Sequence, residues 1–312
     1  MLLSRRHVRI KIMQVLYGAY ITAENLTPSV AEARYRRRID ETHNLYLLTL
    51  LQLQNIIAYT QRDTAIRAAK LLPTDQDRAF TDILFTNPVA QSLLEHEDLQ
   101  KLFKTRLLLP LQNPNITKQL YHAFVALPSF LEYQAQQPTD TTQHREIILE
   151  LFKFIHKHDL FLSWIDDCTT NWDDDKSLVI GAIKRTLKGL PDDRNFTQIY
   201  QPDHETCTEF GSELLQNIIH FSEYLAALVT PRLQNWEESR VTPIDMVMIR
   251  MGIAEFLYCP SINTSVTMDE YIEIAKTYST DKSQEFINGI LDNVLKHLLE
   301  EGKILKQGRG LI

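Results

Sequence analysis

The sequence predicts an all-α protein, and three observations support this fold class. Glycine is scarce, with 9 residues in a chain of 312, whereas ordinary proteins contain about 7% glycine. Apolar residues recur at helical spacing, and no segment shows the sustained alternation that is typical of strands. Proline and asparagine residues separate the apolar segments, as expected for successive helices joined by turns.

The first helix is expected over residues 5–20, with Ser4 as its N-cap. Its apolar positions form one stripe, made of Val8, Ile12, Val15, Leu16 and Ala19. A long helix is expected over 40–72 and ends at Pro73. Its most apolar part, 45–59, is interrupted by polar residues, which indicates a buried helix and not a membrane span.

Shorter helices are expected over 75–86, 88–109, 115–136, 142–168 and 176–189, and another over 206–233. Thr242, Pro243 and Asp245 then supply an N-cap, a proline at the first helical position and an acid in the first turn. That helix stops at Pro260. A capping box over 267–270 predicts the start of the next helix, and the last helix is expected over 281–301.

Charge and cysteine content restrict the function further. The formal net charge of -7 argues against a uniformly basic protein that coats nucleic acid, but it allows a local basic site. Cys168, Cys207 and Cys259 have no close spacing, which predicts a reducing, cytoplasmic environment without a disulfide framework. The first residues do not have the pattern of a signal peptide.

The motifs of the common enzyme classes are missing, so neither catalysis nor a bound cofactor is expected. The sequence has no glycine-rich phosphate loop, no nucleophile elbow and no paired-histidine zinc motif. The best metal candidate is His156 with His158, near several aspartates. Two histidines that are two residues apart on a helix point to different faces, so a solvated surface is the favoured interpretation and no metal is expected.

The N-terminal segment is more informative. Arg5, Arg6, Arg9 and Lys11 lie within residues 1–17, which contain no acid. Cations in a first helical turn cost about 0.3–1 kcal/mol each, because they oppose the helix dipole. Chemistry alone leaves two interpretations open. The charges are either exposed and screened by solvent, or they form an anion site together with backbone N–H groups.

Two residues near the C-terminus also allow two interpretations. Phe286 is either part of the core, which is the commoner fate of such a residue, or an exposed platform on which a base stacks. Gly289 lies inside a helix at a cost of about 1 kcal/mol, and we expect close packing between helices to require it.

Four segments resemble the NusB family of bacterial transcription antitermination factors. They are residues 245–256, 269–276 and 286–292, and the arginine-rich start that is followed by Gln14-Val15-Leu16-Tyr17. These motifs occur in the order of the family and cover about residues 4–21 and 205–300. The resemblance implies a fold of two packed three-helix bundles. It divides the chain into an RNA-binding domain (1–21 and 205–301), a large helical region of unknown role inserted after the first helix (22–204), and a short basic tail (302–312).

The resemblance also implies a function without catalysis. Such proteins pair with the small ribosomal protein NusE and bind single-stranded boxA RNA in ribosomal RNA leaders, so that RNA polymerase resists termination. The RNA-contacting positions of the family match Arg5, Arg6, His7, Arg9, Lys282, Ser283 and Phe286. Positions near its NusE contact match Tyr17, Asp245 and Arg250. A homodimer of the free protein remains open.

Each of these assignments has a structural alternative. Asp245 can serve as a helix cap, Tyr17 as a core residue, and Arg250 as the partner of an acid on its own helix. Two positions also depart from the family. Lys282 stands where the family usually has an acid, and His7 replaces an arginine, which makes one contact titratable near neutral pH.

Two other functions compete with this interpretation. One is a protein-interaction scaffold in which the helical insertion recruits a partner and RNA binding is lost. The other is an RNA-modifying enzyme with a NusB-like domain. The second is disfavoured because the middle of the chain lacks the strand and glycine-rich loop of a methyl-donor domain.

Overall fold

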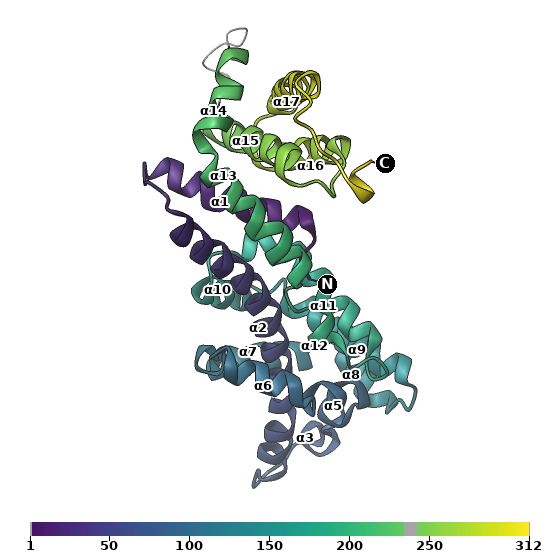
Figure 1. The fold of residues 1–312 in the computed structure, drawn as a ribbon. Coiled ribbons are helices and arrows are strands. Elements are labelled where there is room, and N and C mark those ends of the chain that lie inside the picture. Colours follow the sequence, from purple (N-terminus) through teal and green to yellow (C-terminus); the bar gives the residue numbers. More distant parts are fainter. Residues whose placement is uncertain (1, 234–241, 312) are drawn as a thin grey trace. The chain divides into compact units, whose positions relative to one another are not determined.

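The computed structural model describes residues 2–233 and 242–311, and every regular element within those ranges is helical (Figure 1). The all-α prediction is therefore confirmed. The chain forms two compact units. Residues 3–40 and 202–312 make up the terminal unit, and residues 41–201 make up the middle unit. The described helices include none that is both long enough and apolar enough to cross a membrane.

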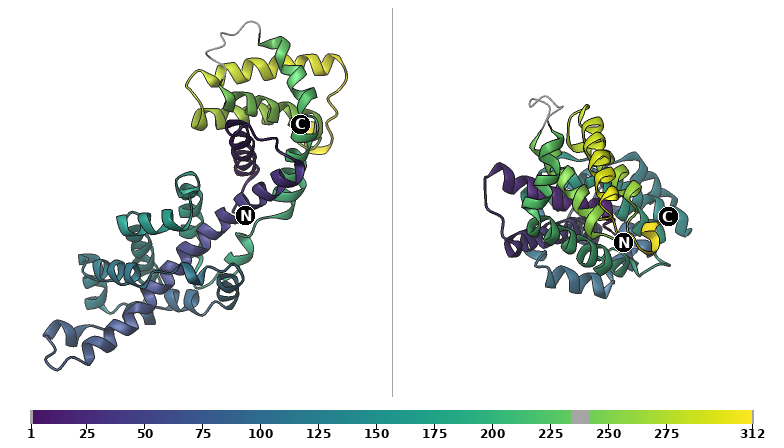
Figure 2. Two further views of the ribbon diagram at one scale, coloured as in Figure 1. Left: turned by 90° about the vertical axis from the view of Figure 1, so that its left-hand side faces the viewer. Right: turned by 45° about the horizontal axis from the view of Figure 1, so that its top comes forward.

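The terminal unit is built around α15. It consists of α1 (Arg5–Ile21), the first part of α2 (Pro28–Ala68), η2 (Glu205–Ser212), α13 (Glu213–His220), α14 (Ser222–Val229), η3 (Thr230–Arg232), α15 (Pro243–Tyr258), α16 (Thr264–Tyr278), α17 (Ser283–Glu300) and η5 (Gly308–Leu311). Helix α15 packs against α1, α13, α14, α16 and α17 (Figure 2). It is buried almost all round, as expected for a helix that is apolar on every face.

The middle unit is a separate bundle of shorter helices. It contains α3 (Asp75–Ala79), α4 (Ile83–Thr86), α5 (Pro88–Leu94), α6 (Glu97–Thr105), η1 (Leu109–Leu111), α7 (Pro114–Val125), α8 (Pro128–Gln136), α9 (Thr141–Ile155), α10 (Asp159–Cys168), α11 (Trp172–Gly189) and α12 (Phe196–Ile199). Helix α9 packs against α5, α7, α8 and α11. The second part of α2 also belongs to this unit, and its apolar residues from Leu45 to Ile57 are buried, which confirms the interpretation of this stretch as a buried helix.

Several helix boundaries differ from the expected ones because caps were missed. Helix α2 begins at Pro28 and not at residue 40, since Thr27 accepts a hydrogen bond from the Val30 N–H and proline suits the first helical position. The single helices expected over 88–109, 115–136 and 142–168 are each two helices. The second helices of the three pairs begin at Glu97, Pro128 and Asp159. His96 and His158 are the N-caps of two of them, and their rings accept hydrogen bonds from backbone N–H groups of the first turn.

Two boundaries in the terminal unit were also wrong. The helix expected over 206–233 is divided into the π-helical turn η2 and the α-helices α13 and α14. Helix α16 begins at Thr264 behind the N-cap Asn263, and not at the capping box expected at Thr267. The Thr267 hydroxyl instead donates to Glu255 in the core. The N-caps expected at Ser4 and Thr242 are confirmed.

The glycine that allows close helix packing is Gly252 and not Gly289. A Cβ atom at Gly252 would lie 2.9 Å from Leu291 Cδ2, so α15 and α17 approach closely there. Gly289 is exposed, and the expectation for it was wrong. Gly211 in η2 is equally constrained. A Cβ atom there would overlap the Tyr35 hydroxyl, which donates to the Cys207 carbonyl at 2.7 Å, and would lie 2.7 Å from Val8 Cγ1.

The basic tail lies against α15 through one of its two lysines and through its backbone. The ammonium group of Lys306 donates to the carbonyl oxygens of Glu255, at 3.2 Å, and Cys259, at 2.9 Å, at the C-terminal end of that helix. The Gln307 N–H donates to the Pro260 carbonyl at 2.9 Å. A cation at this end of a helix is favourable, because the last carbonyls carry partial negative charge.

We predict that Gly211→Ala destabilises the protein by about 1–3 kcal/mol, the usual cost of overpacking a core. Urea unfolding measures this change. Gly18→Ala is the matched control. Gly18 also lies within a helix, α1, but no atom lies within 4 Å of its Cβ position. It should leave stability unchanged or raise it by up to about 1 kcal/mol. Equal effects of the two variants would contradict this account of η2.

Candidate nucleic-acid interface

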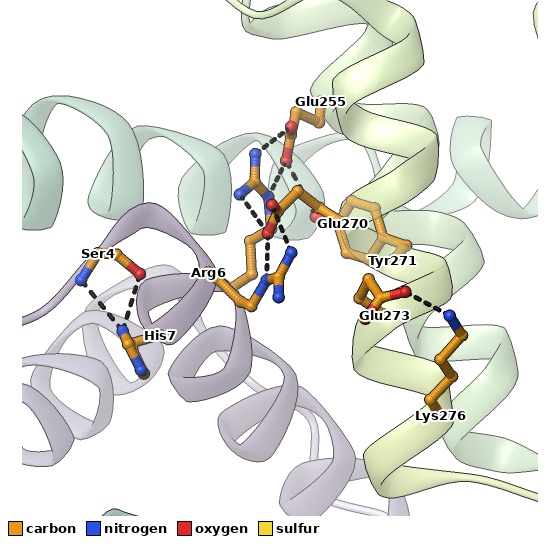
Figure 3. Close-up of polar contacts among 9 residues, drawn as sticks. Ser4, Arg6, His7, Glu255, Glu270, Tyr271, Glu273 and Lys276 are labelled. Atoms are coloured by element: carbon orange, nitrogen blue, oxygen red, sulfur yellow. Dashed lines mark hydrogen bonds and ion pairs between the residues drawn. The ribbon is translucent and has the colours of Figure 1, made fainter. Parts of the chain in front are cut away.

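The N-terminus of α1 is held by a reciprocal cap. The Ser4 N–H donates to His7 Nδ1 at 3.2 Å, and Ser4 Oγ lies 2.8 Å from the same nitrogen (Figure 3). No acid lies in the first turn. The cap therefore holds His7 against the helix terminus, while the side chains of Arg5 and Arg6 extend from it.

Arg9 belongs to the core and not to a phosphate site. Its side chain is 2% exposed, and it donates from Nε and Nη2 to the two carboxylate oxygens of Glu255 at 2.8 and 2.6 Å. Burial disfavours the charge of Arg9, but the hydrogen bonds and the charge of Glu255 outweigh this effect and raise the pKa of Arg9 above its ordinary value. The guanidinium of Arg9 is thus already paired and buried in the free protein, and the RNA contact expected of Arg9 stays a prediction.

The carboxylate of Glu255 joins α15 to α1 and α16. Besides Arg9 of α1, the hydroxyl of Thr267 donates to its carboxylate at 2.8 Å and that of Tyr271 at 3.2 Å, both from α16. Burial, followed by the charge of Glu255, raises the pKa of Tyr271. The carboxylate is fully buried and accepts hydrogen bonds from all these donors, as a buried charge requires.

Arg6 points toward solvent but is also paired. It is 45% exposed and donates from Nε and Nη2 to the oxygens of Glu270 at 2.8 and 2.9 Å (Figure 3). The hydrogen bonds to Glu270 raise the pKa of Arg6. Burial alone would raise the pKa of Glu270, but the hydrogen bonds and charges of Arg6 and Arg9 lower it below its usual range. Arg9 Nη1 also lies 3.4 Å from this carboxylate.

Arg5 is 37% exposed and has the weaker pairing of the two. Its Nη2 atom lies 3.2 Å from Glu205, an exposed residue of η2. Its guanidinium carbon is 5.6 Å from the centre of the Phe210 ring, within the range of a cation–π contact. Ion pairs between exposed groups contribute about 0–1 kcal/mol, so this pair is easily exchanged.

Arg5 and Arg6 line an open cleft of about 530 Å³, which we call the arginine cleft. Its other lining residues are Ser4, His7, Arg9, Ile262, Val266 and Glu270. Three guanidinium groups and the positive end of a 17-residue helix meet in it. The arrangement favours an anion that can replace the carboxylates on the exposed arginines.

The expected RNA residues near α17 are mostly buried. Ser283 donates to Asp245 Oδ2 at 2.9 Å, and the Phe286 side chain is 2% exposed. Asp245 is fully buried and also accepts from Ser279 at 2.6 Å, so it joins α15 to the start of α17. Ser283, Phe286 and Asp245 are thus buried in the free protein, and the RNA contacts expected of Ser283 and Phe286 and the partner contact expected of Asp245 stay predictions. Of this group, only Lys282 is exposed.

The remaining two partner residues lie beside a second cavity. Tyr17 is half-buried on α1. Arg250 is half-buried on α15, and its Nε atom is buried without a hydrogen-bond partner among the described residues. Arg250 lines a cavity of about 320 Å³ whose apolar wall includes Leu16, Leu26 and Val247. The alternative in which Arg250 pairs with an acid on its own helix is not observed.

Sequence reasoning missed the acids that pair with the arginines. Glu255 carried a signal, because it is an acid within the otherwise apolar stretch from Met251 to Tyr258. An acid in a fully buried helix needs a cationic or hydrogen-bonding partner. Glu270 belongs to the capping box expected over 267–270, and this interpretation did not predict its ion pair with Arg6. The metal candidate is not assembled, and no group of three or more metal-ligating side chains occurs in the described ranges.

We predict that Arg9→Ala destabilises the protein by about 3–5 kcal/mol, because it leaves the buried charge of Glu255 without a counter-ion. Urea unfolding tests this, with Arg36→Ala as a control at an exposed arginine whose pair with the half-buried Glu32 is expected to contribute less than about 1 kcal/mol. The double variant Arg9→Met with Glu255→Gln removes both charges and keeps one oxygen acceptor for the hydroxyl of Thr267 or Tyr271, while the amide NH2 group can donate to the oxygen of the other hydroxyl. It should recover most of the loss, and failure to do so would contradict the ion-pair account.

The sequence profile of the NusB family matches residues 182–296. Three proteins named "Transcription antitermination protein NusB" are similar to the chain. That of Chloroherpeton thalassium is 38% identical over 104 residues, which are 33% of this chain and 49% of that protein. That of Salinibacter ruber is 36% identical over 104 residues, 33% of this chain and 65% of that protein.

The third relative, from Finegoldia magna, is 36% identical over 97 residues, which are 31% of this chain and 71% of that protein. The chain thus spans between about half and 71% of the length of these relatives. No solved structure matches it. The profile match lies in the C-terminal part, so residues 1–181, including α1, precede it. The resemblance noted in the sequence is confirmed, and the chain belongs to the NusB family.

Proposed function

We propose that this protein is a cytoplasmic transcription antitermination factor that binds single-stranded boxA-type RNA of ribosomal RNA leaders together with NusE. The names of its relatives support antitermination as the process. The family is not enzymatic, and the protein is accordingly a non-catalytic factor. The observation that carries the RNA proposal is the arginine cleft, in which Arg5 and Arg6 extend into an open space at the positive end of α1.

In this proposal RNA phosphates replace carboxylates. Glu205 on Arg5 and Glu270 on Arg6 hold both guanidinium groups in the free protein. A backbone phosphodiester offers the same bidentate geometry as a carboxylate and carries one negative charge, as a carboxylate does, so it can take the place of a carboxylate on the exposed arginines. Arg9 is buried at the arginine cleft, where it adds positive charge without contacting the phosphate. Lys282 is exposed and completes the set of cations that we assign to RNA.

We propose that α1 belongs to the same RNA-binding domain and that the middle unit is an insertion into it. The profile match does not reach α1. Supporting the proposal, α1 packs on α15, α16 and η2 within the terminal unit, and Arg9 joins it to Glu255. The insertion then begins within α2, near residue 41, and not directly after the first helix.

NusE is the partner that we propose for the cavity at Arg250. The buried Nε atom lacks an acceptor in the free protein, which a carboxylate or carbonyl group of a partner would supply. The apolar wall beside it suits an aliphatic side chain next to that acceptor. Tyr17 lies on the same helix as the cavity residues Leu16 and Ala19. The complex would then join RNA polymerase through both proteins.

The RNA proposal predicts that Arg5→Ala with Arg6→Ala weakens binding of boxA-type RNA and lowers the slope of log K against log[salt] by about 1–2 units, since each phosphate contact on a single strand contributes about 0.7. Filter binding at several salt concentrations measures this. The control is Arg34→Ala with Arg36→Ala, which removes two ion-paired arginines from α2. An unchanged slope, or an equal loss in the control, would refute the arginine cleft as the RNA site.

The partner proposal predicts that Arg250→Met weakens NusE binding at least about tenfold, as loss of an interface anchor does. Isothermal titration of the two proteins measures the affinity. The stability of the free protein should be unchanged or higher, because the variant removes a buried donor that has no acceptor. A large loss of stability with unchanged NusE affinity would make Arg250 a purely structural residue.

A further inference from the structure

A second cleft adjoins the arginine cleft and shares Arg5 with it. Its volume is about 430 Å³, and it lies between η2 with α13 on one side and the C-terminal end of α15 with residues 259–261 on the other. Its lining includes Tyr258, Phe210 and the three glutamates Glu205, Glu209 and Glu213. We call it the tyrosine cleft.

Tyr258 is a rigid aromatic wall of this cleft. Its ring stacks on that of Phe221, with centroids 4.6 Å apart and planes 14° from parallel. His220 packs edge-on against Phe221 at 4.6 Å. Both stacked rings are half-buried, so Tyr258 is supported by Phe221 and offers its remaining surface to the cleft. Supported aromatic rings of this kind are the usual platforms for bases of single-stranded RNA.

The glutamates decide which part of a nucleotide can enter. Glu205 pairs with Arg5 at 3.2 Å, and Glu209 lies 3.4 Å from His204. Glu213 is exposed and forms no hydrogen bond or ion pair with another described residue. Carboxylates repel phosphate, so a nucleotide would present its base to them and leave its phosphate at Arg5. An ionised carboxylate only accepts hydrogen bonds, so the base must offer donors.

We propose that the tyrosine cleft binds a guanine base of single-stranded RNA, with the ring on Tyr258 and the Watson–Crick edge on Glu213. Guanine carries two adjacent donors, N1–H and the N2 amino group, and these match both oxygens of a carboxylate. Adenine and cytosine place a ring nitrogen acceptor beside their amino group, and uracil places carbonyl groups on both sides of N3–H. Those acceptors would repel the carboxylate. The inference rests on the proposed function and adds base selection to it.

The test uses uridine dodecamers that contain one central guanine, adenine or inosine, with binding measured by fluorescence anisotropy on the full chain. We expect the guanine RNA to bind about tenfold more tightly than the adenine RNA, in the range of a bidentate base contact. Inosine lacks the N2 amino group and should lie between them. Glu213→Gln should abolish the preference, while Glu223→Gln, an exposed acid of α14 outside the cleft, should keep it.

Tyr258→Leu should weaken binding of the guanine RNA at least fivefold, the effect of losing one stacked base, and Tyr258→Phe should restore it. The Phe variant keeps the stack on Phe221, so it separates a loss of stacking from a loss of folding. Equal binding of the guanine and adenine RNAs, or a guanine preference that survives Glu213→Gln, would overturn the inference. If the Arg5 and Arg6 variant still loses RNA affinity in that case, the proposed function stands. If that variant binds as the native chain does, the proposed function itself fails.

Discussion

The structure of the terminal unit depends on one buried ion pair, that of Arg9 with Glu255. The Arg9 and Glu255 side chains are 2% and 0% exposed, and Glu255 also holds Thr267 and Tyr271 of α16. A buried charge that loses its partner is far more costly than an exposed one. The pair therefore specifies how α1 lies on α15 and α16, and with it the direction in which Arg5 and Arg6 extend.

This constraint separates the N-terminal arginines into two roles. Arg9 is removed from solvent, whereas Arg5 and Arg6 remain on the rim of the arginine cleft, each held by a carboxylate. The free protein thus carries neutralised cations in a chain whose net charge is -7. In the proposed function, phosphate groups of the RNA replace these carboxylates on Arg5 and Arg6. This favours selective contact over general attraction and agrees with the acidic lining of the neighbouring tyrosine cleft.

The sequence predicts those features that depend on neighbours along the chain. The helical class, the caps at Ser4 and Thr242 and the buried stretch of α2 follow from local pattern and are confirmed. The expected helix boundaries were wrong where an unusual residue serves as the N-cap, as the histidines before α6 and α10 do. The capping box at Thr267 failed because a tertiary hydrogen bond to Glu255 uses its hydroxyl.

The site itself was only partly predictable, because its contacts are distant in sequence. Arg9 and Glu255 are 246 positions apart, and no local rule indicates that one arginine of the segment is buried while its neighbours are exposed. Phe286 and Ser283 face the core for the same reason, since packing of α17 against α15 decides their orientation. The family resemblance supplies the positions, and long-range packing decides which of them are exposed in the free protein.

The most direct test of this account is an NMR titration that follows the arginine Nε–Hε resonances while a boxA-type single-stranded RNA is added. The account predicts a well-resolved, slowly exchanging signal for Arg9, because its Nε–H is buried and donates to Glu255. That signal should stay in place while the signals of Arg5 and Arg6 shift. An Arg9 signal that moves with the RNA while those of Arg5 and Arg6 stay unchanged would contradict the division of roles on which the account rests.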